Sequence, residues 1–149
     1  MRRANAGFTL MELMITVGII SILAGIAYPS YLKQMQKSNR SDAKILLSDV
    51  SQRLQRCFTA HSKYNPAAGT CTVVDDLQAP AGIESTEGYY VVKIAAAADL
   101  TASTYLLTVT PVAGKKQETD DDCDTFTIDQ AGVRAALDSG GADNTDECW

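Results

Sequence analysis

Hydrophobic residues are concentrated near the start of the chain. From Phe8 to Tyr28 the side chains are almost all Leu, Ile, Met, Val, Ala and Gly, and Glu12 is the single ionisable group before Tyr28. At about 1.5 Å per residue, a helix over this stretch is about 30 Å long, the thickness of the hydrocarbon core of a bilayer. The pattern therefore predicts a helix that is able to span a membrane.

The pattern becomes amphipathic after Pro29. Apolar residues then recur at intervals of three and four, which is typical of a helix with one apolar stripe. The residues of this stripe are Ala43, Leu47, Val50, Leu54, Cys57 and Phe58. Because proline lacks an N–H, Pro29 is expected to kink or locally melt the helix without ending it. We predict one helix from Phe8 to about Ser62, about 80 Å long, ended by Asn65-Pro66.

The rest of the chain has the pattern of a small antiparallel sheet. Runs of β-branched and aromatic residues, each bounded by turn formers, predict strands at residues 89–94, 104–110, 125–129 and 133–137. A meander of about four strands across the apolar stripe is the economical packing, so the expected fold class is α+β. Residues 65–88 are predicted to be a long loop with no more than one short element, anchored by Val73, Val74 and Leu77.

Composition and charge narrow the class of protein. A length of 149 residues, 46% of them hydrophobic, suits one compact domain behind one membrane helix. The net charge of -5 argues against general affinity for nucleic acids. The charge is unevenly distributed, since residues 33–63 carry seven basic and two acidic side chains whereas residues 64–149 carry four basic and fifteen acidic ones.

The cysteines indicate an oxidising environment. Cys57, Cys71, Cys123 and Cys148 are widely spaced and contain no Cys-x-x-Cys pair, unlike a zinc site or a thioredoxin motif. Two disulfides formed outside the cytoplasm are favoured, and this would place the globular part there. Their order in the sequence suggests Cys57 with Cys71 and Cys123 with Cys148, although four cysteines allow three connectivities.

No pattern of an active site appears in the sequence. Cys57 and the single histidine, His61, are four residues apart, but Cys57 has a disulfide partner in the favoured pairing and no hydrolase, phosphate-loop or dinucleotide motif is present. The acidic residues 120–122 and Asp124 lack the alternating ligands and the glycine of a calcium loop, so a solvated turn is favoured. We expect no enzyme activity, no metal and no cofactor.

Glu12 is the unusual residue of the apolar stretch. An unpaired charge in hydrocarbon costs at least about 2.5 to 3.5 kcal/mol. The stretch contains no Lys, Arg or His. A cation from outside must pair with Glu12, unless Glu12 lies at the interface and is hydrated.

A short basic leader, residues 1–7, precedes this stretch and ends in Gly7. The arrangement Gly7 followed by Phe8-Thr9-Leu10-Met11-Glu12 resembles the class III signal of type IV pilins. The resemblance implies that a prepilin peptidase cuts after Gly7, that the new amine on Phe8 is N-methylated, and that Glu12 pairs with the amine of a neighbouring subunit. An ordinary signal peptide cut near Ala27 is the alternative, which Glu12 and the length of the apolar run disfavour.

The resemblance to the type IV pilin fold covers essentially the whole chain. It implies a removed leader (1–7), a membrane or filament-core half of the helix (8–32), in which Pro29 supplies pliancy for assembly, an amphipathic half (33–63) and a globular head (64–149). The head would comprise an αβ loop (65–88), a sheet (89–137) and a disulfide-bounded D-region (123–148), and the Cys148-Trp149 ending is most like that of a minor pilin.

The function implied by the resemblance is that of a filament subunit. Before assembly the chain would be anchored in the inner membrane with its head outside the cytoplasm. It would then be incorporated into an extracellular pilus for twitching motility, adhesion or DNA uptake. The implied partners are other pilin subunits, the prepilin peptidase and the assembly machinery, whereas DNA binding stays open and is not predicted. A pseudopilin of type II secretion is the alternative.

The basic face of the helix has three competing uses. Lys33, Lys37, Arg40 and Lys44 are spaced by four, three and four residues, so they lie on one helix face. This face could bind anionic headgroups, DNA, or the acidic head of another subunit. We favour another subunit, because the opposite local charges would attract across a filament.

Overall fold

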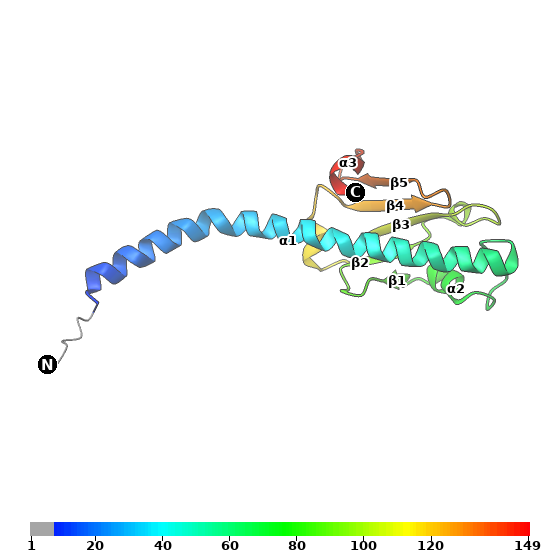
Figure 1. Ribbon diagram of the computed structural model, residues 1–149, viewed down its shortest axis with the longest axis horizontal. Helices are drawn as coiled ribbons and strands as arrows, with labels where there is room; N and C mark the ends of the chain where they lie inside the picture. The colour runs from blue at the N-terminus through cyan, green and yellow to red at the C-terminus, as the bar shows by residue number, and fades with distance from the viewer. Residues whose placement is uncertain (1–7) are drawn as a thin grey trace. The chain divides into compact units, whose positions relative to one another are not determined.

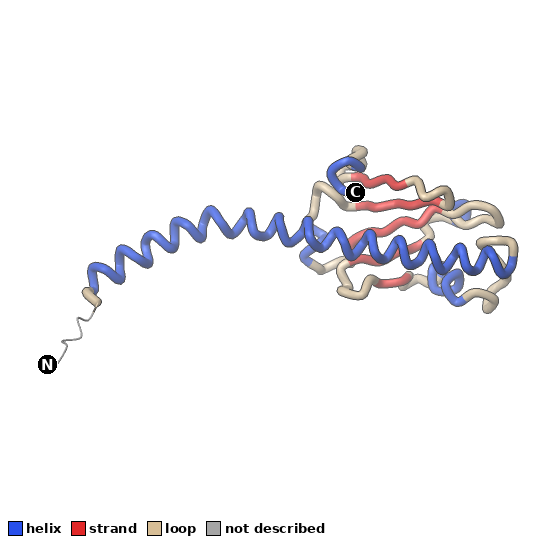
Figure 2. Tube along the Cα trace, in the orientation of Figure 1, coloured by secondary structure: helices blue, strands red, loops and turns tan. Residues whose placement is uncertain are grey.

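The computed structural model describes residues 8–149, and these residues divide into two compact units (Figures 1 and 2). The first unit extends to Met35 and contains the beginning of the long helix α1, while the second, Gln36–Trp149, contains the rest of α1 and all other elements. The elements in chain order are α1 (Leu10–His61), α2 (Thr72–Gln78), β1 (Ile83–Glu84), β2 (Tyr90–Lys93), η1 (Ala97–Asp99), β3 (Leu106–Pro111), η2 (Lys116–Thr119), β4 (Thr125–Asp129), β5 (Arg134–Leu137) and α3 (Thr145–Cys148).

The ends of α1 are set by local backbone chemistry. At its start the N–H of Glu12 donates to Oγ1 of Thr9, at 3.2 Å, which is half of a Thr-x-x-Glu capping box. At its end Ser62 adopts a φ of 58°, and its N–H donates to the carbonyl of Phe58 at 2.7 Å. This left-handed residue terminates the helix before Pro66 is reached. The prediction of one helix that continues through Pro29 is confirmed, whereas its end is set by Ser62 and not by Asn65-Pro66.

The sheet is an antiparallel meander in the order β1-β2-β3-β4-β5. The four predicted strands are present as β2 to β5, and the fifth, β1, lies in the segment predicted as a loop. This strand has only two residues, Ile83 opposite Val92 and Glu84 opposite Val91, too few for a sequence pattern to reveal. The same segment also contains α2, so the prediction of no more than one short element there is wrong. Val73, Val74 and Leu77 of α2 are buried as the predicted anchors.

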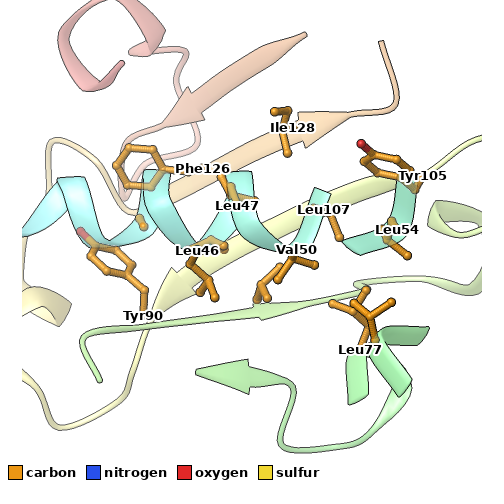
Figure 3. Close-up of a cluster of buried hydrophobic side chains, with 14 of the residues drawn as sticks. Leu46, Leu47, Val50, Leu54, Leu77, Tyr90, Tyr105, Leu107, Phe126 and Ile128 are labelled. Atoms are coloured by element: carbon orange, nitrogen blue, oxygen red, sulfur yellow. The ribbon is translucent and has the colours of Figure 1, made fainter. Parts of the chain in front are cut away.

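One face of the sheet packs on α1 to form the core (Figure 3). Alternate residues of the strands point into this core, which is the period expected for a sheet with one buried face. The buried hydrophobic residues from the strands are Tyr90, Val92, Leu107, Val109, Phe126, Ile128 and Ala136, and those from α1 are Ala43, Leu46, Leu47, Val50, Leu54 and Cys57. Phe58 is instead 36% exposed and stacks on Tyr64 with ring centroids 4.5 Å apart.

Candidate functional site

The first part of α1 is an apolar surface on which no other part of residues 8–149 is packed. An 18-residue window of the helix has a mean hydropathy of 2.2, and 0% of it is buried. The large apolar side chains from Phe8 to Tyr28 are more than half exposed, among them Leu10 at 78% and Ile26 at 74%. A continuous apolar surface of this size marks a contact with a membrane or with other proteins.

The hydroxyls in this part of the helix are compatible with an apolar environment. Oγ1 of Thr16 donates to the carbonyl of Leu13 at 2.8 Å, and Oγ of Ser21 donates to the carbonyl of Val17, also at 2.8 Å. Because these two hydroxyls are satisfied within the helix, their donors stay paired when they are buried in lipid or between helices. Polar side chains therefore do not prevent this segment from entering hydrocarbon.

Glu12 is the exception on this surface. It is exposed in the first turn of α1 and forms no ion pair within residues 8–149. An acidic side chain in the first turn also interacts favourably with the helix dipole, so Glu12 has a local role besides any contact with a partner. Phe8 is 81% exposed just before the helix. The expected cleavage position, Gly7, lies outside the described residues.

The basic face of α1 is occupied by the head of the same subunit. Arg40 is buried and donates to both carboxylate oxygens of Asp120, from Nε at 2.8 Å and from Nη2 at 2.7 Å. Asp120 also accepts from Nε2 of Gln117 at 2.7 Å. Lys37 pairs with Glu147 at 2.7 Å. The expectation that this face is left for the acidic head of another subunit is therefore wrong for Lys37 and Arg40, because acids far along the same chain reach them.

Trp149 packs on the head as an aromatic anchor. Its ring meets Phe126 edge-on at a centroid distance of 5.9 Å, and the Arg134 guanidinium lies 4.9 Å from its centroid. Lys44 donates from Nζ to the carbonyl of Trp149 at 3.3 Å and is 5.9 Å from the ring. Such contacts suit an aromatic ring between the core and solvent. The Trp149 ring is therefore packed on the head.

The last residues of the chain cover the open edge of the sheet. The N–H of Asn144 donates to the carbonyl of Ala136, and the N–H of Ala136 donates to Oγ1 of Thr145, both at 2.9 Å. Nε1 of Trp149 donates to the carbonyl of Ala135 at 3.0 Å. The two bonds to Ala136 satisfy backbone groups of β5 that would otherwise be free to pair with another chain.

Two disulfides fasten the head. The S–S bonds join Cys57 to Cys71 and Cys123 to Cys148, which is the pairing that the sequence favoured. The first ties the end of α1 to the start of α2, and the second ties the segment before β4 to α3. The second therefore holds the residues that cover β5.

The described residues hold no recognisable reaction centre. Cys57 is oxidised in a disulfide, and His61 is exposed at the end of α1, so they do not form a nucleophile and a base. Within the same part of the chain no three His, Cys, Asp or Glu side chains are grouped so that they could hold a metal ion. The surfaces that remain are suited to binding and assembly.

A long helix with an exposed apolar beginning and an antiparallel sheet against its second part defines the class of protein as pilin-like. Residues 29–127 match the family model described as "Type IV minor pilin ComP, DNA uptake sequence receptor", and residues 2–28 match the "Prokaryotic N-terminal methylation motif". The chain belongs to this family of type IV minor pilins.

Similar proteins include pilins from several bacteria. The chain is 42% identical over 64 residues to "Type IV major pilin protein PilA" of Myxococcus xanthus, covering 43% of this chain and 29% of that protein. It is 31% identical over 81 residues to "Type IV major pilin protein PilE1" of Neisseria gonorrhoeae, covering 52% and 49%. It is 33% identical over 78 residues to "Fimbrial protein EcpC" of Eikenella corrodens, covering 50% and 51%. The matches thus span about half or less of the length of each relative.

Proposed function

We propose that this chain is a minor subunit of a type IV pilus and that it polymerises through the first part of α1. The observation that carries the proposal is the exposed apolar surface from Phe8 to Tyr28, in which Glu12 is the single ionisable group before Tyr28. Its burial is favourable in a bilayer before assembly and among parallel helices afterwards. The role is structural, and no catalytic step belongs to it.

Processing at the N-terminus is part of the proposal. Cleavage after Gly7 would leave an amine on Phe8, and the match of residues 2–28 to the methylation motif supports this step. In the filament Glu12 would pair with the amine of a neighbouring subunit, so that two buried charges neutralise each other. A subunit out of register would leave both charges unpaired, which makes the pairing selective. Pro29, which lacks one helix hydrogen bond, would supply pliancy during assembly.

The proposed location follows from the disulfides. Cys57–Cys71 and Cys123–Cys148 need an oxidising compartment, so the head would lie outside the cytoplasm while the apolar helix stays in the inner membrane. In this proposal residues 8–32 lie in the membrane or the filament core and residues 33–149 lie outside it, as expected from the sequence. Other pilin subunits, the prepilin peptidase and the assembly machinery are the proposed partners.

The experiment that tests this function compares Glu12→Ala with wild type in cells that assemble pili. Membrane insertion of the precursor should be unchanged, because the substitution makes the helix more apolar. Incorporation into sheared filaments should fall severely, because the neighbour's amine loses its partner. Glu12→Asp keeps the charge and serves as the matched control. Normal incorporation of Glu12→Ala would contradict the proposed pairing.

DNA binding is a second candidate function, favoured by the description of the matching family as a DNA uptake sequence receptor. Two adjoining surface depressions near the end of α1 share Arg56 and Ala60, and one of them also includes Arg53 and His61. Arginine side chains such as Arg56 contact phosphates, although Arg53 is also paired with Asp49 at 2.7 Å. Arg56→Ala should weaken DNA binding and reduce its salt dependence; equal binding by the variant would remove this surface from consideration.

A further inference from the structure

A surface pocket lies between α1 and the turn that joins β1 to β2. One wall is a single face of α1 and the other is the tip of the turn. The lining residues are Ser38, Asn39, Ser41, Asp42, Ile45, Thr86, Glu87 and Tyr89, and the pocket has a volume of about 500 Å³. The internal contacts described above do not use this pocket.

The turn that forms the outer wall is held in a fixed shape. One backbone hydrogen bond joins Ser85 and Tyr90 across it, with the N–H of Ser85 donating to the carbonyl of Tyr90 at 2.9 Å. Oγ of Ser85 also accepts from the N–H of Tyr90 at 3.1 Å. Gly88 has a φ of 69°, a value that favours glycine, and its N–H donates to the carbonyl of Ser85 at 3.0 Å. The pocket is therefore preformed.

Asp42 lacks a partner at the inner wall of this pocket. The residue is only 9% exposed, and its Oδ2 is buried without a hydrogen-bond donor. No ion pair to Asp42 or to Glu87 is formed by any residue in the range 8–149. A buried carboxylate without a cation beside it is costly, and a cation that contacts the part of Asp42 lining the pocket would lower that cost.

The chemistry of the lining specifies what would fit. Asp42 and Glu87 supply negative charge, while Ser38, Ser41 and Asn39 supply further polar groups. Ile45 is 64% exposed at the side of the pocket, and Tyr89 lies across from it on the turn. A side chain with a cationic head and an apolar stem matches both features, which is the combination found in lysine and arginine.

We propose that this pocket receives a lysine or arginine side chain from a neighbouring pilin subunit, with Asp42 as the principal acceptor. The assignment to a subunit rests on the proposed role in pilus assembly. It is supported by the opposite charges of the acidic lining, Asp42 and Glu87, and of a lysine or arginine side chain. A neighbour seated here would also cover Ile45, a large apolar residue exposed on the helix of the head.

The pocket is tested by titrating the full chain, in detergent micelles, with n-butylguanidinium chloride as a mimic of the arginine side chain. NMR signals of the Ile45 methyl groups and of the Thr86 and Tyr89 amides should shift saturably. Asp42→Asn should bind about tenfold more weakly, because a charge-assisted hydrogen bond is lost. The control is Asp49→Asn, a carboxylate of the same helix that is already paired with Arg53 and does not line the pocket.

The outcomes separate a cation site from a pocket that holds only water. Saturable binding that depends on Asp42 and not on Asp49 supports the proposal. The absence of saturable shifts in wild type, beyond those caused by sodium chloride at equal ionic strength, would overturn it. Equal affinities of wild type and Asp42→Asn would overturn it as well.

Incorporation of variants into filaments tests whether the side chain in the pocket comes from a neighbouring subunit. Asp42→Asn should lower incorporation into filaments, while the unfolding temperature of the same variant in micelles stays equal or rises, because an unpaired buried charge has been removed. A purely structural role would lower both. Unchanged incorporation would overturn the assignment to a neighbour. If wild type never enters filaments, the proposed role in a pilus is wrong, and the assignment of the occupant to a neighbouring subunit is wrong as well. The titration with n-butylguanidinium still tests whether the pocket binds a cation.

Discussion

Arg40 and Asp120 form a buried, bidentate ion pair between α1 and the residue that follows η2. The two side chains keep only 6% and 3% of their surface exposed. The hydrogen bonds to Asp120 raise the pKa of Arg40 above its ordinary value, so the guanidinium stays charged at any pH at which the protein folds. The pair fixes the segment that leads into Cys123 against the helix.

The ion pair should be costly to break from one side. Arg40→Met leaves the Asp120 carboxylate buried without its cation and should lower the free energy of unfolding by about 3 to 5 kcal/mol. The measurement is chemical denaturation of the full chain in micelles. Lys37→Met, which breaks the exposed pair with Glu147, is the control and should have little effect.

The double variant Arg40→Met/Asp120→Leu distinguishes a lost pair from general damage. Two apolar side chains of similar size leave no buried charge, so much of the lost stability should return. If the loss of unfolding free energy in the double variant equals the sum of the losses in Arg40→Met and Asp120→Leu, an uncompensated buried charge is not the cause of the instability.

The contact between Lys37 and Glu147 should appear in the pH dependence of stability. The hydrogen bond from Lys37 lowers the pKa of Glu147, so this carboxylate binds its proton less readily in the folded state than in the unfolded state. Its contribution is present above the ordinary glutamate pKa of about 4.3 and is lost as the pH falls through the lower folded value. The stability difference between wild type and Glu147→Gln should therefore shrink as the pH is lowered through this range. A constant difference would show that the two residues are not paired in solution.

Tyr90 should make the head sensitive to alkali. Its hydroxyl is buried without a partner among the described side chains, and burial raises its pKa well above the ordinary value of about 10. As the pH rises above the ordinary value of about 10, this tyrosine ionises in the unfolded chain before it does so in the folded one, so wild type loses stability. Tyr90→Phe should be close to neutral at pH 7 and should lose less stability than wild type above pH 10, in the same denaturation assay. A large loss at pH 7 would mean that the hydroxyl has a partner.

The two disulfides should protect different parts of the head. Each closes a short loop, with sequence separations of 14 and 25 residues, so removing either should cost about 3 kcal/mol. In Cys123→Ala/Cys148→Ala, hydrogen exchange should accelerate at the amides of β5, because the segment that covers its edge is released. In Cys57→Ala/Cys71→Ala, exchange should accelerate in α2 and leave β5 protected. The same exchange pattern in both variants would contradict this division.

The sequence predicts the elements of this fold better than the contacts between them. Local patterns are enough to place α1 and the four longer strands. These patterns are a continuous apolar run, a helical period after Pro29, and β-branched or aromatic runs between turn formers. The capping role of Thr9 was overlooked although the Thr-x-x-Glu signature is visible in the sequence. Ser62 in a left-handed conformation carries no such signature, since non-glycine residues adopt it rarely.

The ion pairs of the basic face of α1 show why contacts between distant residues cannot be predicted from the sequence. Arg40 and Asp120 are 80 residues apart, and Lys37 and Glu147 are 110 apart. Opposite charges in two halves of a chain predict attraction, but they do not tell whether it acts within a subunit or between subunits. The unpaired Asp42 was likewise indistinguishable from its solvated neighbours until the turn after β1 was placed beside it.

Mass spectrometry of the mature N-terminus, on protein recovered from sheared filaments, tests the central claim most directly. The account predicts a chain that begins at Phe8 and carries an N-methyl group, and a Gly7 substitution to a bulky residue should leave the uncut precursor in the membrane. A mature chain that begins beyond Ala27 would contradict it, because the apolar helix would then be a discarded signal and could not form the core of a filament.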